Sequence, residues 1–400
     1  MPWRRRPFRS SDIQRALNIS HLREIARRRI PHLAFEYLEG GAEDELSLRG
    51  NRAALASWRF VPNTLVETSS RHQRTQLFGR EMSTPLIIAP TGMNGVFRRD
   101  ADLALARAAA KAGIPFCLST VSTTRLEKIA AEAGGRLWMQ LYVMRDRKVA
   151  ENIVARAHAA GYEALVFTTD ANVFGYREWD RLNYVRPGRP TLRSMLDMLR
   201  HPLWVRDVVL RGIPQFENIA EFLPPGAASA VGGSTIIPDL FGPTITWDDI
   251  AWLRSLWDRK LIVKGILSTA DAERAAQLGC DGIVLTNHGG RQLDCCVAPI
   301  DVVAEISSAV GQRLTVIVDS GFRRGNDVVK ALALGADAVM IGRATLYGVV
   351  AGGEAGVSRA LEILTKEIDR TLGHLGCRSV EELGPHLLRR THSCNAAGEA

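Results

Sequence analysis

Residues 282–294 read GIVLTNHGGRQLD, an apolar run that turns directly into a histidine, two glycines and an arginine. The run GIVL has the composition of a buried strand, because β-branched and large apolar side chains favour strands. An ordinary turn needs neither His288 nor Arg291. The stretch is therefore either a turn with one solvated arginine or a strand that ends in catalytic groups, and by itself it leaves both open.

Similar apolar runs recur from residue 85 onward, separated by helical segments. The runs are PLIIAP (85–90), PFCLST (115–120), LWMQLYV (137–143), ALVFTTD (164–170), KLIVKGI (260–266), GIVLTNH (282–288), LTVIVDS (314–320) and AVMIGRA (338–344). Their continuous apolar character indicates parallel strands that helices cover on both faces. Eight βα units in series predict an α/β fold of the (β/α)8 TIM barrel type. No G-x-G-x-x-G follows any run, which argues against a Rossmann NAD site.

Short motifs mark the ends of the helices between these runs. Residues 124–127, Thr-Arg-Leu-Glu, have the spacing of a capping box and predict that a helix begins there. Gly134 and Gly135 are predicted to end that helix, and Ser268 and Gly279 to open and close a later one. These ends fit the alternation of helix and strand that the barrel requires.

The spacing of the runs divides the chain into three parts. Residues 1–84 are predicted to be an N-terminal helical extension packed on the barrel, 85–385 the barrel itself, and 386–400 a C-terminal tail. The insertion 171–245, after the fourth run, is too long for an ordinary loop. Its segment 192–212 mixes four arginines with Leu196, Met198, Leu203, Trp204 and Val208, which suits an active-site lid, a membrane-surface patch or a partly disordered loop. As a membrane-surface patch, it would place these five apolar side chains in the acyl boundary and the arginines at anionic headgroups.

Composition restricts the class of protein. Of the 400 residues, 46% are hydrophobic and 24% are charged, as in an ordinary soluble enzyme. The net charge of +8 suits an anionic substrate, an anionic cofactor or an acidic membrane surface, whereas no zinc-finger or RNA-binding motif supports a nucleic-acid partner. The six cysteines are expected to be reduced thiols in a cytoplasmic protein. We recognise neither a signal peptide nor an apolar run long enough to span a bilayer.

Polar residues stand at nearly every predicted strand end. In chain order they are Thr91 with Gly92, Ser119, Gln140 with Tyr142, Thr168 with Asp170, Lys264, Thr286 with His288 and Arg291, Asp319 with Arg323, and Gly342 with Arg343. The carboxyl ends of the strands of a TIM barrel meet at one mouth, where the active site lies. Such convergence is not needed by a structural scaffold, so the sequence predicts an enzyme.

The last two strand ends indicate a phosphate site. Loops after strands seven and eight commonly bind phosphate in this fold. Gly321 and Gly342 would let backbone N–H groups approach an anion, and Arg323 and Arg343 would neutralise it. Lys264 on a buried strand must meet a negative charge or lose its proton, so it forms either a Schiff base or a pair with an anion on a cofactor.

These residues together resemble the FMN-dependent 2-hydroxy acid dehydrogenases and oxidases, from about residue 12 to about residue 385. The matching stretches are YLEGGAEDE (37–45), APTGMNG (89–95), GIPFCLST (113–120), WMQLYV (138–143), TTD (168–170), GYREWD (175–180), KGIL (264–267), NHGGRQLD (287–294), DSGFRRG (319–325) and ALGADAVMIGRATLYG (333–348). Within the family, GGAEDE and PTGMNG are similar to the mandelate dehydrogenase branch. QLYVMRDR and HPLWVRDVVLRG are similar to the flavin-type lactate dehydrogenase branch.

The resemblance implies catalytic roles for individual residues. His288 resembles the general base, and Asp170 the carboxylate that orients it and stabilises the imidazolium. Tyr142 would bond the substrate hydroxyl, and Lys264 would lie near flavin N1 and stabilise the reduced cofactor. Implied for the substrate carboxylate are Arg177, Arg291 and Tyr37.

The resemblance also implies FMN as cofactor and no metal. The expected flavin contacts are Pro90, Thr91, Gly92, Ser119, Gln140, Thr168, Lys264 and Thr286. Asp319 would hold the ribityl hydroxyls, with Gly321, Arg323, Gly342 and Arg343 around the phosphate. Thr286 stands where many members have serine, a change that keeps the hydroxyl. Val121 stands where glycolate oxidase has tryptophan, which leaves room for a larger substrate unless Phe174 fills that space.

The implied function is that of an FMN-dependent (S)-2-hydroxy acid dehydrogenase that prefers an aromatic acid such as mandelate. Lactate or a longer aliphatic hydroxy acid is the alternative substrate. A Schiff-base lyase or aldolase using Lys264 and a catalytically silent, membrane-peripheral module are the alternatives of another class. Gly92, where strong oxidases of the family have alanine, favours a quinone or another acceptor over O2. A homotetramer is expected from the family, as is a cytoplasmic location that becomes peripheral on the inner face of the cell membrane if segment 192–212 binds lipid.

Overall fold

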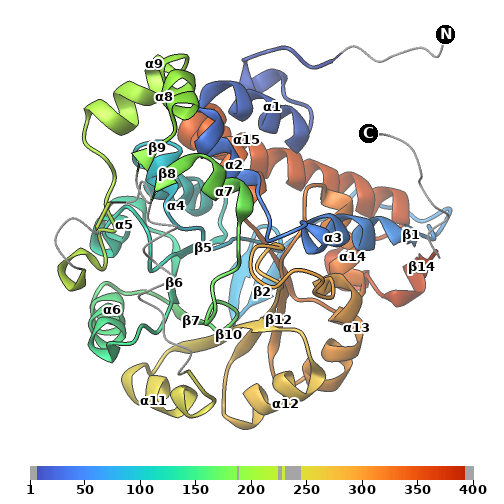
Figure 1. The fold of residues 1–400 in the computed structure, drawn as a ribbon. Helices are drawn as coiled ribbons and strands as arrows, with labels where there is room; N and C mark the ends of the chain where they lie inside the picture. Colours follow the sequence, from blue (N-terminus) through green and yellow to red (C-terminus); the bar gives the residue numbers. More distant parts are fainter. Residues whose placement is uncertain (1–6, 187–188, 224–227, 230–244, 392–400) are drawn as a thin grey trace.

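The computed structural model describes residues 7–186, 189–223, 228–229 and 245–391 (Figure 1). Its centre is a closed barrel of parallel strands in the order β10-β11-β12-β13-β4-β5-β6-β7. Their bounds are β4 Leu86–Ile88, β5 Pro115–Leu118, β6 Arg136–Leu141, β7 Ala164–Thr168, β10 Lys260–Ile266, β11 Gly282–Leu285, β12 Thr315–Val318 and β13 Ala338–Ile341. Each strand lies within one of the predicted apolar runs, except that β6 begins one residue earlier, at Arg136, so the predicted (β/α)8 barrel is confirmed.

Helices surround the barrel and bury the outer face of its strands (Figure 1). They are α4 Ala101–Lys111, α5 Leu126–Ala133, α6 Arg147–Ala159, α11 Asp248–Leu256, α12 Thr269–Gln277, α13 Pro299–Val310, α14 Gly325–Ala333 and α15 Arg343–Leu375. Every residue of β6 and β7 is buried, because side chains of one face fill the barrel and those of the other meet the helices. The apolar runs of the sequence reflect this two-sided burial.

Two of the predicted helix ends are present in the structure. The Ser268 hydroxyl accepts a hydrogen bond from the backbone N–H of Asp271 at the start of α12. Gly134 ends α5 with a φ of +66°, in the region that favours glycine.

A helix begins within residues 124–127 as predicted, at Leu126, but the predicted capping box there is wrong. The N-cap of α5 is Arg125, which makes no side-chain cap, and the N–H of Leu126 donates instead to Asn218 Oδ1 at 2.9 Å. Glu127 faces Arg156, with Nε and Oε1 2.6 Å apart. A residue of the insertion thus takes over the cap, a long-range contact that local spacing does not reveal.

The N-terminal extension contains strands as well as the predicted helices. Its helices are α1 Ile19–Arg29, α2 His32–Glu39 and α3 Leu46–Ser57. β2 Thr75–Leu77 and β3 Arg80–Met82 form a hairpin. β1 Trp58–Phe60 pairs antiparallel with β14 Leu388–Arg390, so the described part of the predicted tail returns to the extension. The division into extension, barrel and tail stays a prediction.

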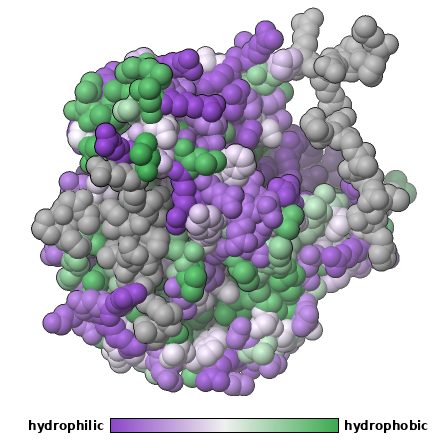
Figure 2. Space-filling model, in the orientation of Figure 1, coloured by the Kyte–Doolittle hydropathy of each residue, from purple (hydrophilic) through white to green (hydrophobic). Residues whose placement is uncertain are grey.

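The described part of the insertion is folded, with an inner and an outer face. It comprises α7 Glu178–Leu182, β8 Tyr184–Arg186, β9 Arg189–Pro190, α8 Leu192–Leu199, α9 Pro202–Trp204, the π-helical turn η3 Val205–Leu210 and η4 Ala220–Phe222. Leu203 and Leu210 are 67% and 75% exposed, and apolar residues gather over α8 and α9 (Figure 2). Residues 224–227 and 230–244 of the insertion lie outside the described part.

Two residues expected to enter lipid do not face outward. Trp204 and Val208 are 5% and 0% exposed, because they pack on the body of the protein. The prediction that these two side chains contact a membrane is therefore wrong, whereas their neighbours Leu203 and Leu210 remain available. Among the described residues, no helix is both long and apolar enough to cross a membrane.

A bulge in β10 gives the first testable prediction. The register against β11 shifts between Lys264 and Ile266, and Gly265 there has a φ of +124°. A Cβ at Gly265 would lie 2.5 Å from Thr169 Oγ1, so Gly265→Ala should destabilise the fold by about 1–3 kcal/mol. Gly50→Ala is the control, because it lies in α3 with open space around it and should stabilise by about 0.5–1 kcal/mol. Urea unfolding followed by circular dichroism measures both changes, and equal midpoints for the two variants would contradict the strain at Gly265.

Candidate active site

A cavity lies at the carboxyl ends of the barrel strands. Of the residues predicted from the sequence, its lining contains Tyr37, Pro90, Thr91, Gly92, Ser119, Tyr142, Arg177, Lys264, His288, Arg291, Asp319, Gly321, Arg323, Gly342 and Arg343. The other predicted residues, Asp170, Gln140, Thr168 and Thr286, do not line the cavity. Asp170, Gln140 and Thr286 hydrogen-bond to residues of the lining, and Thr168 hydrogen-bonds to Gln140.

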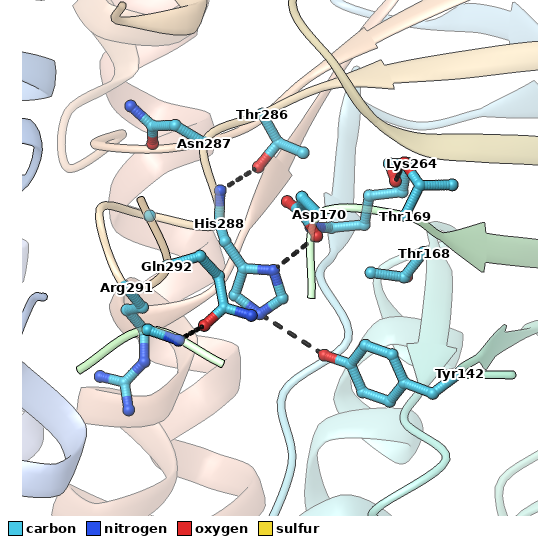
Figure 3. A network of polar contacts seen from close by, with 12 residues as sticks. Tyr142, Thr168, Thr169, Asp170, Lys264, Thr286, Asn287, His288, Arg291 and Gln292 are labelled. Carbon is cyan, nitrogen blue, oxygen red and sulfur yellow. Dashed lines mark hydrogen bonds and ion pairs between the residues drawn. The ribbon is translucent and has the colours of Figure 1, made fainter. Parts of the chain in front are cut away.

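His288 follows β11 with a φ of +56°, a backbone conformation that is unfavourable for a residue with a Cβ. Its N–H donates to Thr286 Oγ1 at 2.9 Å, and this bond helps to hold the turn. Ring atom Nδ1 lies 2.8 Å from Asp170 Oδ1, and Nε2 lies 3.5 Å from the Tyr142 hydroxyl (Figure 3). A carboxylate can only accept from Nδ1–H, which leaves the lone pair on Nε2 directed at the cavity in the neutral ring.

The charges around His288 determine its protonation. Burial lowers the pKa of His288 more than the Asp170 carboxylate raises it, so the ring is neutral at pH 7. Burial opposes the ionisation of Asp170, but His288 and Lys264 together hold its pKa below the usual range. The site therefore holds a neutral base beside a carboxylate that stabilises the protonated form of that base.

Lys264 is buried between two carboxylates. Its Nζ lies 3.8 Å from Asp170 Oδ2 and 3.7 Å from Asp319 Oδ2. Burial disfavours the ammonium, yet Asp170 and Asp319 raise the pKa of Lys264 above its ordinary value. The side chain is consequently a fixed cation and not a neutral amine that could attack a carbonyl.

Two guanidiniums face the cavity without a carboxylate partner in the described part of the chain. Arg291 donates to Gly40 O at 2.7 Å and lies over the Tyr37 ring, 5.1 Å from its centroid. Arg177 donates to Arg291 O at 3.3 Å and lies 4.8 Å from the Phe174 ring centroid. Burial, with the neighbouring Arg291, lowers the pKa of Arg177 to about 10, so it stays charged at neutral pH. This wall is suited to an anionic ligand.

Buried hydroxyl and amide groups behind the cavity wall hydrogen-bond to one another and to Ser119 and Asp319 of the lining. Ser119 Oγ donates to Gln140 Oε1 at 3.1 Å, and Gln140 Nε2 donates to Thr168 Oγ1 at 3.0 Å. On the other side, the Thr286 hydroxyl donates to Asp319 Oδ1. Gln140, Thr168 and Thr286 thus orient Ser119 and Asp319, which do line the cavity.

The loop before α14 and the N-terminal end of α15 border the cavity with basic residues, whereas the N-terminus of α14 itself is capped by Asp327 and Glu367. Gly321 has a φ of +91°, and Gly342 precedes the first turn of α15 without a side-chain cap. Arg323 donates to the Tyr347 hydroxyl at 3.1 Å and pairs with no carboxylate among the described residues. Helix N-termini beside arginine and glycine make an anion site, as predicted for a phosphate.

Arg343 lines the cavity, but its guanidinium is directed at backbone carbonyls. It donates to Leu38 O, Gly40 O and Gly289 O at 3.1, 3.0 and 2.9 Å. A contact between Arg343 and a phosphate therefore requires a different side-chain conformation from the one observed.

The donor set fits FMN. Arg323, Arg343 and the uncapped N-terminus of α15 gather where a phosphate needs them, and Asp319 and Ser119 offer partners for hydroxyls. The buried Lys264 cation suits the negative charge that a reduced flavin carries. Asp170 Oδ2 is buried and has no hydrogen-bond partner among the described residues, so the site retains polar capacity toward a bound group.

Several lining residues carry no polar signal and were not predicted. They include Leu38, Met93, Phe97 and Leu346. Met93 lies inside the quoted stretch APTGMNG and accepts a hydrogen bond on Sδ from the Tyr37 hydroxyl at 3.2 Å. Val121 and Phe174 both line the cavity as well, so neither alone determines its size.

Comparison with known proteins supports the assignment. Residues 26–390 match the family model for FMN-dependent dehydrogenase. The chain is 44% identical over 385 residues to the (S)-mandelate dehydrogenase of Pseudomonas putida, which covers 96% of each chain. It is 41% identical over 372 residues to a putative L-lactate dehydrogenase of Mycobacterium tuberculosis, covering 92% of this chain and 88% of the relative.

Solved structures agree in fold. The crystal structure described as the monotopic membrane protein (S)-mandelate dehydrogenase superposes with a TM-score of 0.89 at 44% identity, covering 94% of this chain and all of the other. A mandelate oxidase variant with (S)-mandelic acid superposes with a TM-score of 0.78 at 35% identity, covering 95% and 100% of the two chains. The family and cofactor predicted from the sequence are thereby confirmed. The chain belongs to the FMN-dependent dehydrogenase family and is an oxidoreductase with FMN as its cofactor.

Proposed function

We propose that the enzyme oxidises an (S)-2-hydroxy acid to the 2-oxo acid and prefers an aromatic substrate such as mandelate. The observation that carries the proposal is the neutral His288 ring, oriented by Asp170 and adjacent to two guanidiniums without carboxylate partners among the described residues. A base beside a carboxylate-binding wall is what the oxidation of a hydroxy acid requires. The relatives named mandelate and L-lactate dehydrogenase support this substrate class.

In this proposal, the arginines hold the substrate and His288 moves the proton. Arg177 and Arg291 bind the carboxylate in a forked geometry, with the Tyr37 hydroxyl beside them. Tyr142 bonds the substrate hydroxyl oxygen. Nε2 of His288 takes one of the two protons that the substrate loses, and Asp170 stabilises the resulting imidazolium through Nδ1–H. FMN, when bound, would supply the acceptor for the two electrons and the second proton.

The remaining site residues are proposed to bind the cofactor. Lys264 lies where its charge would face the pyrimidine side of the flavin, and Asp319 would bond the ribityl chain. The proposed phosphate site consists of Gly321, Arg323, Gly342 and Arg343. The proposed contacts to the flavin ring come from Pro90, Thr91, Gly92 and Ser119. Gln140, Thr168 and Thr286 would act on the ring through the neighbours that they orient. The lyase alternative lacks support because Lys264 is held protonated by two carboxylates.

We also propose that the enzyme attaches to the surface of an acidic membrane and passes electrons to a quinone there. The outer face of the insertion exposes Leu192, Leu196, Leu199, Leu203 and Leu210. Apolar side chains beside arginines suit the boundary between headgroups and acyl chains. The solved relative described as a monotopic membrane protein supports this location.

Replacing His288 tests the base. His288→Asn should keep FMN bound but slow flavin reduction by about 10²–10⁴, because it removes the imidazole that takes the proton. Anaerobic stopped-flow absorbance measures the rate. A rate within tenfold of the unmodified enzyme would contradict the assignment.

The pH dependence gives an independent test. The imidazole acts as a base only when it is unprotonated, and the pKa of His288 is lowered, so the rate should fall toward acidic pH with an apparent pKa below 6.5. Asp170→Asn removes the charge that raises this pKa, so the acidic limb should move to still lower pH while the rate drops. Asp281→Asn, at the start of β11 on the far end of the barrel, is the control and should leave the limb in place.

Substrate choice is tested at Val121. The enzyme should reduce its flavin with (S)-mandelate at a higher kcat/KM than with L-lactate, because Met93, Phe97, Val121 and Leu346 form an apolar wall. Val121→Trp should lower kcat/KM for mandelate by about tenfold or more and affect lactate less, because an indole fills space that only the phenyl group needs. A preference of the unmodified enzyme for lactate would favour the lactate alternative.

The membrane proposal is tested with vesicles. The double variant Leu203→Ser and Leu210→Ser should sediment less with anionic vesicles at low salt and slow the reduction of a quinone carried in them, because it loses apolar area on the outer face. Its rate with a soluble dye should stay the same. The control is Leu256→Ser with Leu278→Ser, two partly exposed leucines at the opposite end of the barrel. If the unmodified enzyme does not bind vesicles even at low salt, the membrane proposal is wrong.

A further inference from the structure

The inner face of the insertion is anchored on the loop between β4 and α4. The Trp204 indole N–H donates to Val96 O at 2.7 Å, and Trp204 is 5% exposed. The Arg99 guanidinium donates to Arg211 O at 2.8 Å. Two hydrogen bonds therefore join the insertion to this loop, and each of them links residues more than a hundred positions apart in the sequence.

The same loop forms one wall of the cavity. Val96 ends the short helix η2 Asn94–Val96, and its N–H donates to Met93 O at 2.9 Å. Met93 lines the cavity and accepts from the Tyr37 hydroxyl at 3.2 Å. Tyr37 in turn lies beneath the Arg291 guanidinium. A continuous series of contacts thus leads from Trp204 to the proposed carboxylate-binding groups.

The loop is stiff enough to transmit a displacement. Asn94 is buried, and its Nδ2 donates to Thr91 O at 2.9 Å and to Asp102 Oδ1 at 2.7 Å. Asp102 is fully buried and accepts from Ser122 Oγ at 2.8 Å, which ties the loop to the next one along the barrel. Met93 has a φ of +60°, a strained conformation that persists only where its surroundings impose it.

We propose that Trp204 is a positioning residue for substrate binding. Its bond to Val96 holds Met93 in place, and Met93 holds the Tyr37 hydroxyl beside the Arg291 guanidinium. The insertion is therefore part of the substrate site as well as a surface element. This role rests on the proposed function in one respect, the use of Tyr37 and Arg291 to bind the substrate carboxylate.

The geometry predicts an effect on binding and not on chemistry. His288 and Asp170 follow β11 and β7, and neither bonds to the loop that Trp204 holds. A looser loop should therefore weaken the hold on the carboxylate while the proton transfer proceeds as before.

Trp204→Phe removes the indole N–H and keeps an aromatic ring in the same space. Trp257→Phe is a matched control, because Trp257 is also buried and donates through Nε1 to a backbone carbonyl, Lys260 O, at 2.9 Å. That carbonyl lies at the start of β10, at the end of the barrel away from the cavity. Both variants lose one buried hydrogen bond, so their melting temperatures should fall by similar amounts.

In the FMN-loaded enzyme, Trp204→Phe should raise KM for (S)-mandelate by about 3–10-fold and leave kcat within twofold. Trp257→Phe should leave both constants unchanged. Hydrogen exchange in the segment 92–99 should become faster in Trp204→Phe only. An equal rise of KM in both variants, a fall of kcat at constant KM, or unchanged exchange in 92–99 would overturn the proposal.

Two further measurements keep the test decisive. If Trp204→Phe does not fold, Arg99→Ala weakens the same contact from the loop side and should raise KM in the same direction. Arg107→Ala, which loses a comparable bond from α4 to Glu132, should not. If no hydroxy acid reduces the flavin of the unmodified enzyme, the proposed function fails, and exchange in 92–99 alone decides whether Trp204 positions the loop.

Discussion

The site depends on one carboxylate, that of Asp170, which contacts two other ionisable side chains. Asp170 Oδ1 binds Nδ1 of His288, and Oδ2 faces the ammonium of Lys264. Burying three ionisable groups is unfavourable unless they compensate one another, so none of them keeps its ordinary state alone. The arrangement requires the ends of β7, β10 and β11 to lie side by side at fixed heights, which a closed parallel barrel provides. The bulge at Gly265 adds the local adjustment that brings the backbone of Thr169 and Asp170 close to β10.

Positive and negative side chains lie in different parts of the cavity. The carboxylates Asp170 and Asp319 lie at the depth of Lys264, whereas Arg177, Arg291, Arg323 and Arg343 lie around them without ion pairs in the described part of the chain. These named side chains carry more positive than negative charge, in the same sense as the overall charge of +8. An anionic cofactor and an anionic substrate are both attracted to them, and burial keeps His288 neutral until it receives a proton.

The insertion has one face exposed to solvent and one face buried against the barrel, and both carry apolar side chains. Leucines such as Leu203 and Leu210 are exposed on one side, and Trp204 and Val208 are buried on the other, although these residues alternate along a single short stretch. A helical turn separates neighbouring residues by about 100°, so adjacent positions can serve opposite faces. The composition of segment 192–212 gave no means of distinguishing them, since all four residues are apolar. Only the contacts with the loop after β4 do so.

The sequence by itself determined the barrel, the family and most of the residues that line the cavity. Continuous apolar runs that alternate with helical segments indicate strands buried on both faces, and the recurrence of polar residues at their ends, such as Lys264 and His288, indicates a site at one end of the barrel. The tertiary structure decided the rest. It replaced the predicted cap at residues 124–127 by Asn218, turned Arg343 toward backbone carbonyls, buried Trp204, and paired β1 with β14. Each of these depends on a contact between residues far apart in the chain, and a local pattern carries no information about which distant groups become neighbours once the chain is compact.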